Sequence, residues 1–128
     1  MGVRVFSSSI IRHGLGEPEL QALVAAFRAY KDTGDPKDVF GRDATFDRPP
    51  SISAAGLQHV HLNEGRPWGV RVLQFGRKSD LHLVYCQGYF RTDCYLLITV
   101  VKGAHAKYRD DLYMLSLADI AAAFRDKY

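Results

Sequence analysis

The feature that most constrains the fold is the apolar run CYLLITVV at Cys94–Val101. Almost every residue of this run is apolar, so a strand formed by it has no polar face to turn toward water. The run is much shorter than the roughly 20 residues that are needed to cross a bilayer. The sequence therefore predicts a soluble protein in which this segment is a central strand covered on both faces.

Two further segments are predicted to form strands beside it. Residues Leu57–Leu62 (LQHVHL) alternate so that both histidines point to one side, and Leu81–Gln87 (LHLVYCQ) is bounded by turn residues. Shorter β-branched runs suggest an opening strand within Val3–Ile11 and another at Val70–Phe75. Together these segments predict a sheet of three to five strands that is mainly antiparallel, because most of the connections are short turns.

Apolar periodicity predicts one helix near each end of the chain. From Pro18 to Lys31 the apolar residues recur at spacings of three and four, and Gly34 follows where the helix would end. Ser116 and Asp119 have the S-x-x-D spacing of a capping box, which predicts that the second helix starts there. The two buried stripes are Leu20, Leu23, Val24, Phe27 and Tyr30 in the first helix and Leu117, Ile120, Ala121 and Phe124 in the second.

A chain of 128 residues with 47% hydrophobic content has enough apolar surface for one core and too little length for two. We therefore expect a single domain, residues 1–128, of the α+β class: an N-terminal helix or helices packed on the sheet, and a C-terminal helix. One face of the sheet is expected to carry the helices and the other to remain open for a ligand. Residues 35–55, rich in Pro, Gly and Asp, are expected to form a turn-rich connection with at most one short helical turn.

Charge and cysteine content narrow the function classes. The net charge is +3, and it divides into −1 for residues 1–64 and +4 for residues 65–128, which is compatible with a polyanionic partner such as RNA. Cys86 and Cys94 are too few for a disulfide scaffold and are expected to be reduced. The N-terminal residues lack the apolar stretch of a signal peptide, so we expect a cytoplasmic protein without a membrane partner.

Signatures of several enzyme classes are missing: there is no phosphate loop, Rossmann glycine pattern, G-x-S-x-G or H-E-x-x-H. The chemistry that remains is that of histidines. His59 and His61 could form a metal pair, but the sequence offers no convincing third and fourth ligand. They could also be strand residues without a role, or they could transfer protons, because the imidazole pKa of about 6.5 suits both acid and base near neutrality.

Cleavage of RNA through its own 2′-OH needs a base, an acid and cations that hold the charge developing on the phosphate. The candidates for proton transfer are His59, His61 and His105, with Arg77 and Lys102 for the phosphate charge. The candidates for RNA binding are Arg42, Lys78, His82, Lys107 and Arg109. His82 has the alternative of a core position, because the other residues on its strand face are apolar. The residues alone do not say which histidine is acid and which is base.

Several segments, in order along the chain, resemble one known family. These are FGRDA at Phe40–Ala44, HVHL at His59–Leu62, QFGR at Gln74–Arg77, HLVYCQG at His82–Gly88 and AFR at Ala123–Arg125. They are similar to the YafO family of type II toxins. The resemblance implies a bacterial toxin that cleaves mRNA in a ribosome-dependent way and a fold similar to the RelE superfamily, with helices on one side of the sheet and the active site on the other. The HLVY segment looks like that superfamily's basic-x-x-Tyr strand, with His82 where an arginine is frequent.

We therefore predict a metal-independent endoribonuclease (mRNA interferase) that needs no cofactor. Its expected partners are the ribosome, mRNA and a cognate antitoxin protein that blocks it. The alternative is a non-catalytic protein that binds the ribosome or another RNA and inhibits translation sterically. A third class, an unrelated enzyme of the same fold, would have a closed pocket for a small molecule rather than an open basic face.

Overall fold

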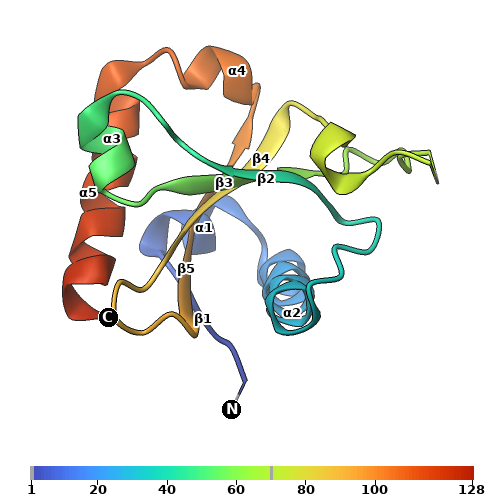
Figure 1. Cartoon of the computed structure of the whole chain (residues 1–128), viewed down its shortest axis with the longest axis horizontal. Helices are drawn as coiled ribbons and strands as arrows, with labels where there is room; N and C mark the ends of the chain where they lie inside the picture. The colour runs from blue at the N-terminus through green and yellow to red at the C-terminus, as the bar shows by residue number, and fades with distance from the viewer. Residues whose placement is uncertain (1, 70) are drawn as a thin grey trace.

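The computed structural model describes residues 2–69 and 71–128, which form a five-stranded sheet with the order β1-β5-β4-β3-β2 (Figure 1). Strand β1 runs parallel to β5, and the other three pairs are antiparallel. The α+β class is confirmed, with a mixed sheet. The strands are β1 (Arg4–Ser7), β2 (Phe40–Thr45), β3 (Gln58–Leu62), β4 (Leu81–Gln87) and β5 (Cys94–Lys102).

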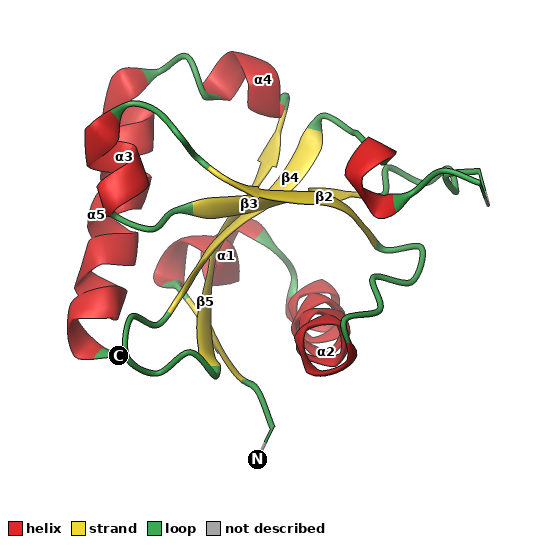
Figure 2. Ribbon diagram, in the orientation of Figure 1, coloured by secondary structure: helices red, strands yellow, loops and turns green. Residues whose placement is uncertain are grey.

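Helices cover both faces of the sheet (Figure 2). Side chains of α1 and α2 pack with one side of β4 and β5, and side chains of α3 and α5 pack with the other. The expectation that one face would stay free of helices is therefore wrong, because β5 is apolar on both sides and each side needs cover. The helices are α1 (Ser9–Gly14), α2 (Glu17–Thr33), α3 (Pro50–Ala54), α4 (Ala104–Lys107) and α5 (Asp111–Lys127), with a 3-10 turn η1 (Gln74–Gly76).

The strands predicted at 57–62, 81–87 and 94–101 are confirmed to within one residue at each end. The opening segment is divided: β1 ends at Ser7, and Ser8 then caps α1 by accepting a hydrogen bond from the Ile11 amide. The strand predicted at 70–75 is wrong for residues 71–75, which form turns and part of η1, while Val70 lies outside the described residues. Leu73 and Phe75 are exposed, so their apolar character does not mark a buried strand.

The predicted turn-rich connection contains a strand. The FGRD segment lies in β2, which pairs with β3 through a bulge between Phe40 and Asp43. At Gly41 an added Cβ would lie 2.3 Å from the carbonyl oxygen of Arg77, so only glycine lets this backbone pass against the following loop. The alternation of apolar and polar residues does not reveal this strand, because its inward-facing positions include the carboxylate of Asp43.

The two long helices differ in how well the sequence predicted them. Helix α2 ends at Gly34, whose φ of 77° is the left-handed cap that the glycine predicts. Helix α5 begins at Asp111, with Asp110 as its cap, so the predicted start near Ser116 is wrong. Ser116 lies inside the helix, and its hydroxyl donates to the Tyr113 carbonyl rather than capping an end. Within the described residues, no helix is both long and apolar enough to span a membrane.

A histidine cluster as the candidate active site

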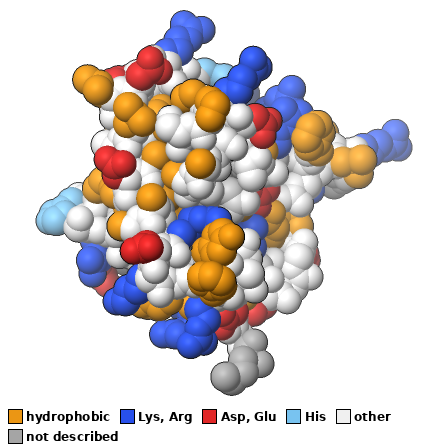
Figure 3. Space-filling model, turned by 60° about the vertical axis from the view of Figure 1, so that its left-hand side comes forward, with side chains coloured by type: hydrophobic (Ala, Val, Ile, Leu, Met, Phe, Trp, Pro, Cys, Tyr) orange, Lys and Arg blue, Asp and Glu red, His pale blue; other side chains and the backbone are white. Residues whose placement is uncertain are grey.

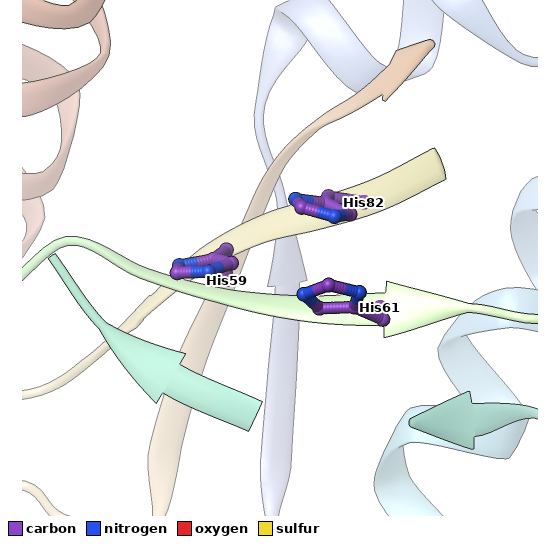
Figure 4. Close-up of side chains that lie close together, drawn as sticks. All are labelled: His59, His61 and His82. Carbon is purple, nitrogen blue, oxygen red and sulfur yellow. The ribbon is translucent and has the colours of Figure 1, made fainter. Parts of the chain in front are cut away.

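Three imidazoles meet on the sheet face that also packs against α5 (Figure 4). His59 and His61 are two residues apart on β3, so their side chains point to the same face of the sheet. The antiparallel register places His61 opposite His82 of β4. The ring centres of His61 and His82 are 3.9 Å apart, and those of His59 and His82 are 5.2 Å apart. The predicted pair of histidines therefore becomes a cluster of three, which we call the histidine cluster.

The main chain of Ser79, in the turn before β4, holds two of these rings. Its N–H donates to Nδ1 of His61 and its carbonyl accepts from Nε2 of His82, both at 2.8 Å. The Tyr108 hydroxyl then donates to Nδ1 of His82 at 2.7 Å. Because a carbonyl only accepts and an amide N–H only donates, both neutral rings carry their proton on Nε2.

His59 is held by packing instead. The ring centres of His59 and Phe46 are 4.3 Å apart. Its Nδ1 is buried and has no hydrogen-bond partner. A buried polar atom without a partner costs roughly 1–3 kcal/mol, so it is seldom retained without a use. His59 is therefore the member of the cluster whose buried ring nitrogen is available for a new contact.

The environment keeps these rings uncharged near neutral pH. Burial, reinforced by the neighbouring His82, lowers the pKa of His59 and of His61 from 6.5 to about 4. Burial also lowers the pKa of His82 below its usual value. A neutral imidazole has a lone pair that can accept a proton, and a pKa of about 4 makes it a weaker base than an ordinary histidine.

His105 adds a fourth imidazole at the edge of the cluster. It lies on α4, with its ring centre 5.8 Å from that of His82. The Asp80 carboxylate accepts from its Nδ1 at 2.7 Å and from its backbone N–H at 2.9 Å. Both side chains are exposed, at 73% and 50%. Asp80 therefore fixes the ring of His105 through Nδ1 and leaves Nε2 for a substrate.

The cluster also meets the distance requirement for a metal site, because one ring nitrogen from each of its three members lies within 4.8 Å of the others. The hydrogen bonds argue against that use. Nδ1 of His61 already accepts from an amide, and both nitrogens of His82 are engaged. An ion could bind all three rings only after these bonds were broken, so the arrangement favours proton transfer over metal binding.

Two of the predicted cations brace a loop. Arg77 donates to the carbonyls of Lys37 and Val72, at 2.7 and 3.2 Å. Arg42 donates from Nε to the Phe75 carbonyl at 2.7 Å and places its guanidinium over the Phe75 ring. Their side chains thus have structural contacts in addition to any contact with a phosphate.

The remaining predicted cations have exposed side chains. Lys102, at the end of β5, lines a shallow hollow together with Asp80. Lys107 ends α4 and Arg109 follows it, while Lys78 directly precedes the turn that holds the imidazoles. In Figure 3 hydrophobic side chains are spread over the visible face, and Lys and Arg side chains stand out at its upper and right-hand margins.

Sequence reasoning missed several members of this site. Ser79 acts through its backbone, which leaves no signal in a side-chain pattern. Tyr108 and Phe46 come from segments that were expected to be loops, and both border an apolar groove of 680 Å³ between α3 and α5. Asp80 was visible only as a turn residue, and its contact with His105 depends on the fold.

A second polar cluster lies on the opposite face, against α2. The Asp43 carboxylate accepts from Tyr85 at 2.5 Å, from Tyr30 at 2.8 Å and from Lys31 at 3.0 Å. Gln74 donates to the Tyr30 hydroxyl at 2.7 Å. Burial, with Asp43 nearby, raises the pKa of both tyrosines. We call this set the Asp43 network.

Comparison with known proteins agrees with these observations. The model of the family described as "Toxin YafO, type II toxin-antitoxin system" matches residues 28–126. The chain is also 41% identical over 132 aligned residues to the mRNA interferase toxin YafO of Escherichia coli (strain K12), covering 98% of this chain and all of that protein. No solved structure matches. The chain belongs to a family of toxins from type II toxin-antitoxin systems. That family is the YafO family, as the sequence motifs predicted.

Proposed function

We propose that this protein is a ribosome-dependent endoribonuclease that cleaves mRNA and thereby inhibits translation and growth. Membership of the YafO family supports the toxin role, and the relative named as an mRNA interferase supports the activity. The observation that carries the mechanism is the buried, unpartnered Nδ1 of His59 among neutral imidazoles. RNA that enters this face would place a hydroxyl against this buried ring nitrogen.

In the proposed reaction His59 accepts the proton of the 2′-OH, and the 2′ oxygen attacks the adjacent phosphorus. The bond from phosphorus to the 5′ oxygen breaks, and His105 donates a proton to that oxygen from Nε2. The products are a 2′,3′-cyclic phosphate, which can open to a 3′ phosphate, and a 5′-hydroxyl end. His61 offers its Nε2–H, and Lys102 its ammonium group, to the phosphoryl oxygens.

The other predicted residues take supporting roles in this proposal. Lys78, Lys107 and Arg109 attract the RNA backbone, and Arg42 and Arg77 hold the loop next to the site while contributing positive charge. His82 keeps both neighbouring imidazoles in place, because its own nitrogens bind Ser79 and Tyr108. No metal ion is needed, because acid, base and cations all come from side chains.

The ribosome supplies what such a sparse site lacks. Cleavage through attack by the 2′-OH requires the attacking and leaving oxygens to be in line with the phosphorus. Positioning of that kind contributes several kcal/mol. We propose that the ribosome holds the mRNA in this conformation, that the protein acts in the cytoplasm, and that a cognate antitoxin covers the face that carries the histidine cluster. Helices α1 and α2 lie on the face opposite the histidine cluster, as a RelE-like fold would place them, but α3 and α5 pack on the face of the cluster itself.

The test combines purified protein with a defined mRNA, with and without translating ribosomes, and maps the new ends. We expect rapid cutting only with ribosomes, and 5′-hydroxyl products. The variant His13→Asn is the matched control for substitutions in the histidine cluster, because His13 is exposed on α1 and contacts only the Ser9 carbonyl. Equal cutting without ribosomes would contradict ribosome dependence, and intact RNA in all tubes would favour the steric inhibitor.

A further inference from the structure

The connection between β3 and β4 carries an unusual charge. Residues 65–78 contain four basic side chains and no acidic one: Arg66, Arg71, Arg77 and Lys78. We call this segment the basic loop. In Figure 1 it projects away from the sheet on the side opposite α5. Among the described residues, none of the ion pairs involves Arg66, Arg71 or Lys78.

The same loop exposes large apolar side chains. Leu73 is 82% exposed and Phe75 is 69% exposed, although large apolar side chains of these types are usually buried. The guanidinium of Arg42 lies 3.8 Å from the centre of the Phe75 ring, and that of Arg77 lies 5.8 Å from the centre of the Trp68 ring. Planar cations and aromatic rings therefore alternate on this surface.

The basic loop is anchored at several points. The Gln74 amide donates to the Gly41 carbonyl at 3.0 Å as well as to the Tyr30 hydroxyl. The Arg42 amide donates to the Arg77 carbonyl at 2.9 Å. These bonds tie the loop to β2 and α2, so its cations are presented at a defined place rather than on a free strand. The loop then continues directly into Ser79, whose backbone holds the imidazoles.

We propose that the basic loop is an RNA-docking surface, in which Arg66, Arg71 and Lys78 contact phosphates and Phe75 stacks on a base. This inference rests on the proposed function and adds to it where the RNA is held. A segment with four cations and no acidic residue of its own fits a polyanion, and exposed aromatic rings beside guanidinium groups fit the stacked bases of RNA better than a protein surface. Because the loop leads into the site, RNA bound on it lies beside the histidine cluster.

The RNA that docks here is the mRNA strand, because the loop continues directly into Ser79, whose backbone holds the imidazoles of the site. Ribosomal RNA presents the same phosphates and bases, so the experiment separates the two. The first experiment compares the triple variant Arg66→Gln/Arg71→Gln/Lys78→Gln with the control Arg12→Gln/Arg28→Gln/Arg91→Gln. The control removes the same charge from exposed positions outside the loop. Binding of a labelled single-stranded RNA and of purified ribosomes is measured across a salt series.

We expect the loop variant to bind at least about tenfold more weakly than the control. We also expect its slope of log affinity against log salt to fall by about 2, from roughly 0.7 per lost contact to single-stranded RNA. Loss of binding to the free RNA identifies the mRNA strand as the ligand, and loss confined to ribosomes identifies ribosomal RNA. Equal binding by the loop variant and the control in both arms would overturn the proposal.

A second variant tests stacking without changing charge. Phe75→Ser is expected to weaken the same RNA binding about tenfold with an unchanged salt slope, because a stacked base is worth roughly 1–3 kcal/mol. Thermal melting of each variant checks folding, and cleavage is recorded in the same tubes. Loop-dependent RNA binding without any cleavage would remove the proposed function and keep this inference. Normal cleavage by loop variants that bind RNA as well as the control would overturn this inference and keep the proposed function.

Discussion

The two faces of the sheet carry polar clusters of opposite kinds. In the Asp43 network both carboxylate oxygens accept hydrogen bonds, and Lys31 supplies the opposite charge at 3.0 Å. In the histidine cluster the charges are absent, and one buried ring nitrogen, on His59, has no partner. The first arrangement leaves the carboxylate little capacity for a ligand. The second leaves a reactive atom whose need for a partner is unmet.

This difference teaches where stability and reactivity lie in the molecule. Hydrogen bonds to charged groups contribute roughly 1.5–3 kcal/mol each, so a satisfied network fixes α2 on the sheet. An unsatisfied buried group lowers stability and is retained where a substrate supplies the missing contact. We therefore expect substitutions on the two faces to separate folding from activity.

The largest effect is expected from the double variant His59→Asn/His61→Asn. Asparagine keeps polarity and removes the titrating nitrogen, so cleavage should fall by at least about 10²-fold, the lower range for losing an acid or base. The measurement is the single-turnover rate with ribosomes, alongside growth arrest on expression. A folded double variant that still arrests growth like the wild type would remove both residues from the mechanism.

The next effect lies on the other face. Asp43→Ala leaves Tyr30, Tyr85 and Lys31 without their shared acceptor, and it should lower the free energy of unfolding by about 3 kcal/mol. Denaturant unfolding measures this loss, with Asp47→Ala, an exposed carboxylate of the following segment, as the control. At a temperature where Asp43→Ala remains folded, its cleavage rate should match the wild type. A large loss of rate in the folded variant would place the Asp43 network in the active site.

The sequence predicted most of the sheet because three of its strands are apolar runs between turns. Strand β2 escaped detection, since FGRDAT contains Arg42 and Asp43 and reads as a loop. The carboxylate of Asp43 is acceptable inside the sheet only because Tyr30 and Lys31 of α2 reach it, a contact that no local window contains. The cover of the second face was missed for the same reason: the C-terminal helix was predicted without its face, and α3 is short and its burial depends on α5.

The candidate site was predictable in part. Alternation along β3 placed His59 and His61 on one side, which needs only the period of a strand. His82 joins them through the β3–β4 register, and the tautomers of the cluster depend on Ser79 and Tyr108. These contacts join distant segments through backbone atoms and one hydroxyl, so residue spacing carries no trace of them.

A smaller effect on folding stability is expected when the pH is lowered. The folded-state pKa of His59 and of His61, about 4, is below the unfolded value of 6.5. The unfolded chain therefore binds protons first as the pH falls, so the stability is fully present above pH 6.5 and is lost as the pH falls toward 4. Between pH 7 and pH 6 the wild type should lose about 1–2 kcal/mol more than His59→Asn/His61→Asn, measured by denaturant unfolding at each pH. Parallel pH curves for the two proteins would show that these buried imidazoles do not control acid stability, and Asp43→Ala should keep the wild-type pH dependence.

The smallest effect is expected from Asp80, which lies at the exposed edge of the histidine face. Its carboxylate holds His105 through two hydrogen bonds, but both side chains are exposed, so solvent screening keeps the energy of the contact small. If that energy orients the ring for protonation of the leaving oxygen, Asp80→Asn should lower kcat about fivefold with little change in KM. Asp93→Asn, in the turn before β5, is the matched control for charge. In the His105→Asn background, Asp80→Asn should have no further effect, because its only route to the reaction is through that ring. A full additional fivefold loss there would show that Asp80 acts on the RNA or on the histidine cluster directly.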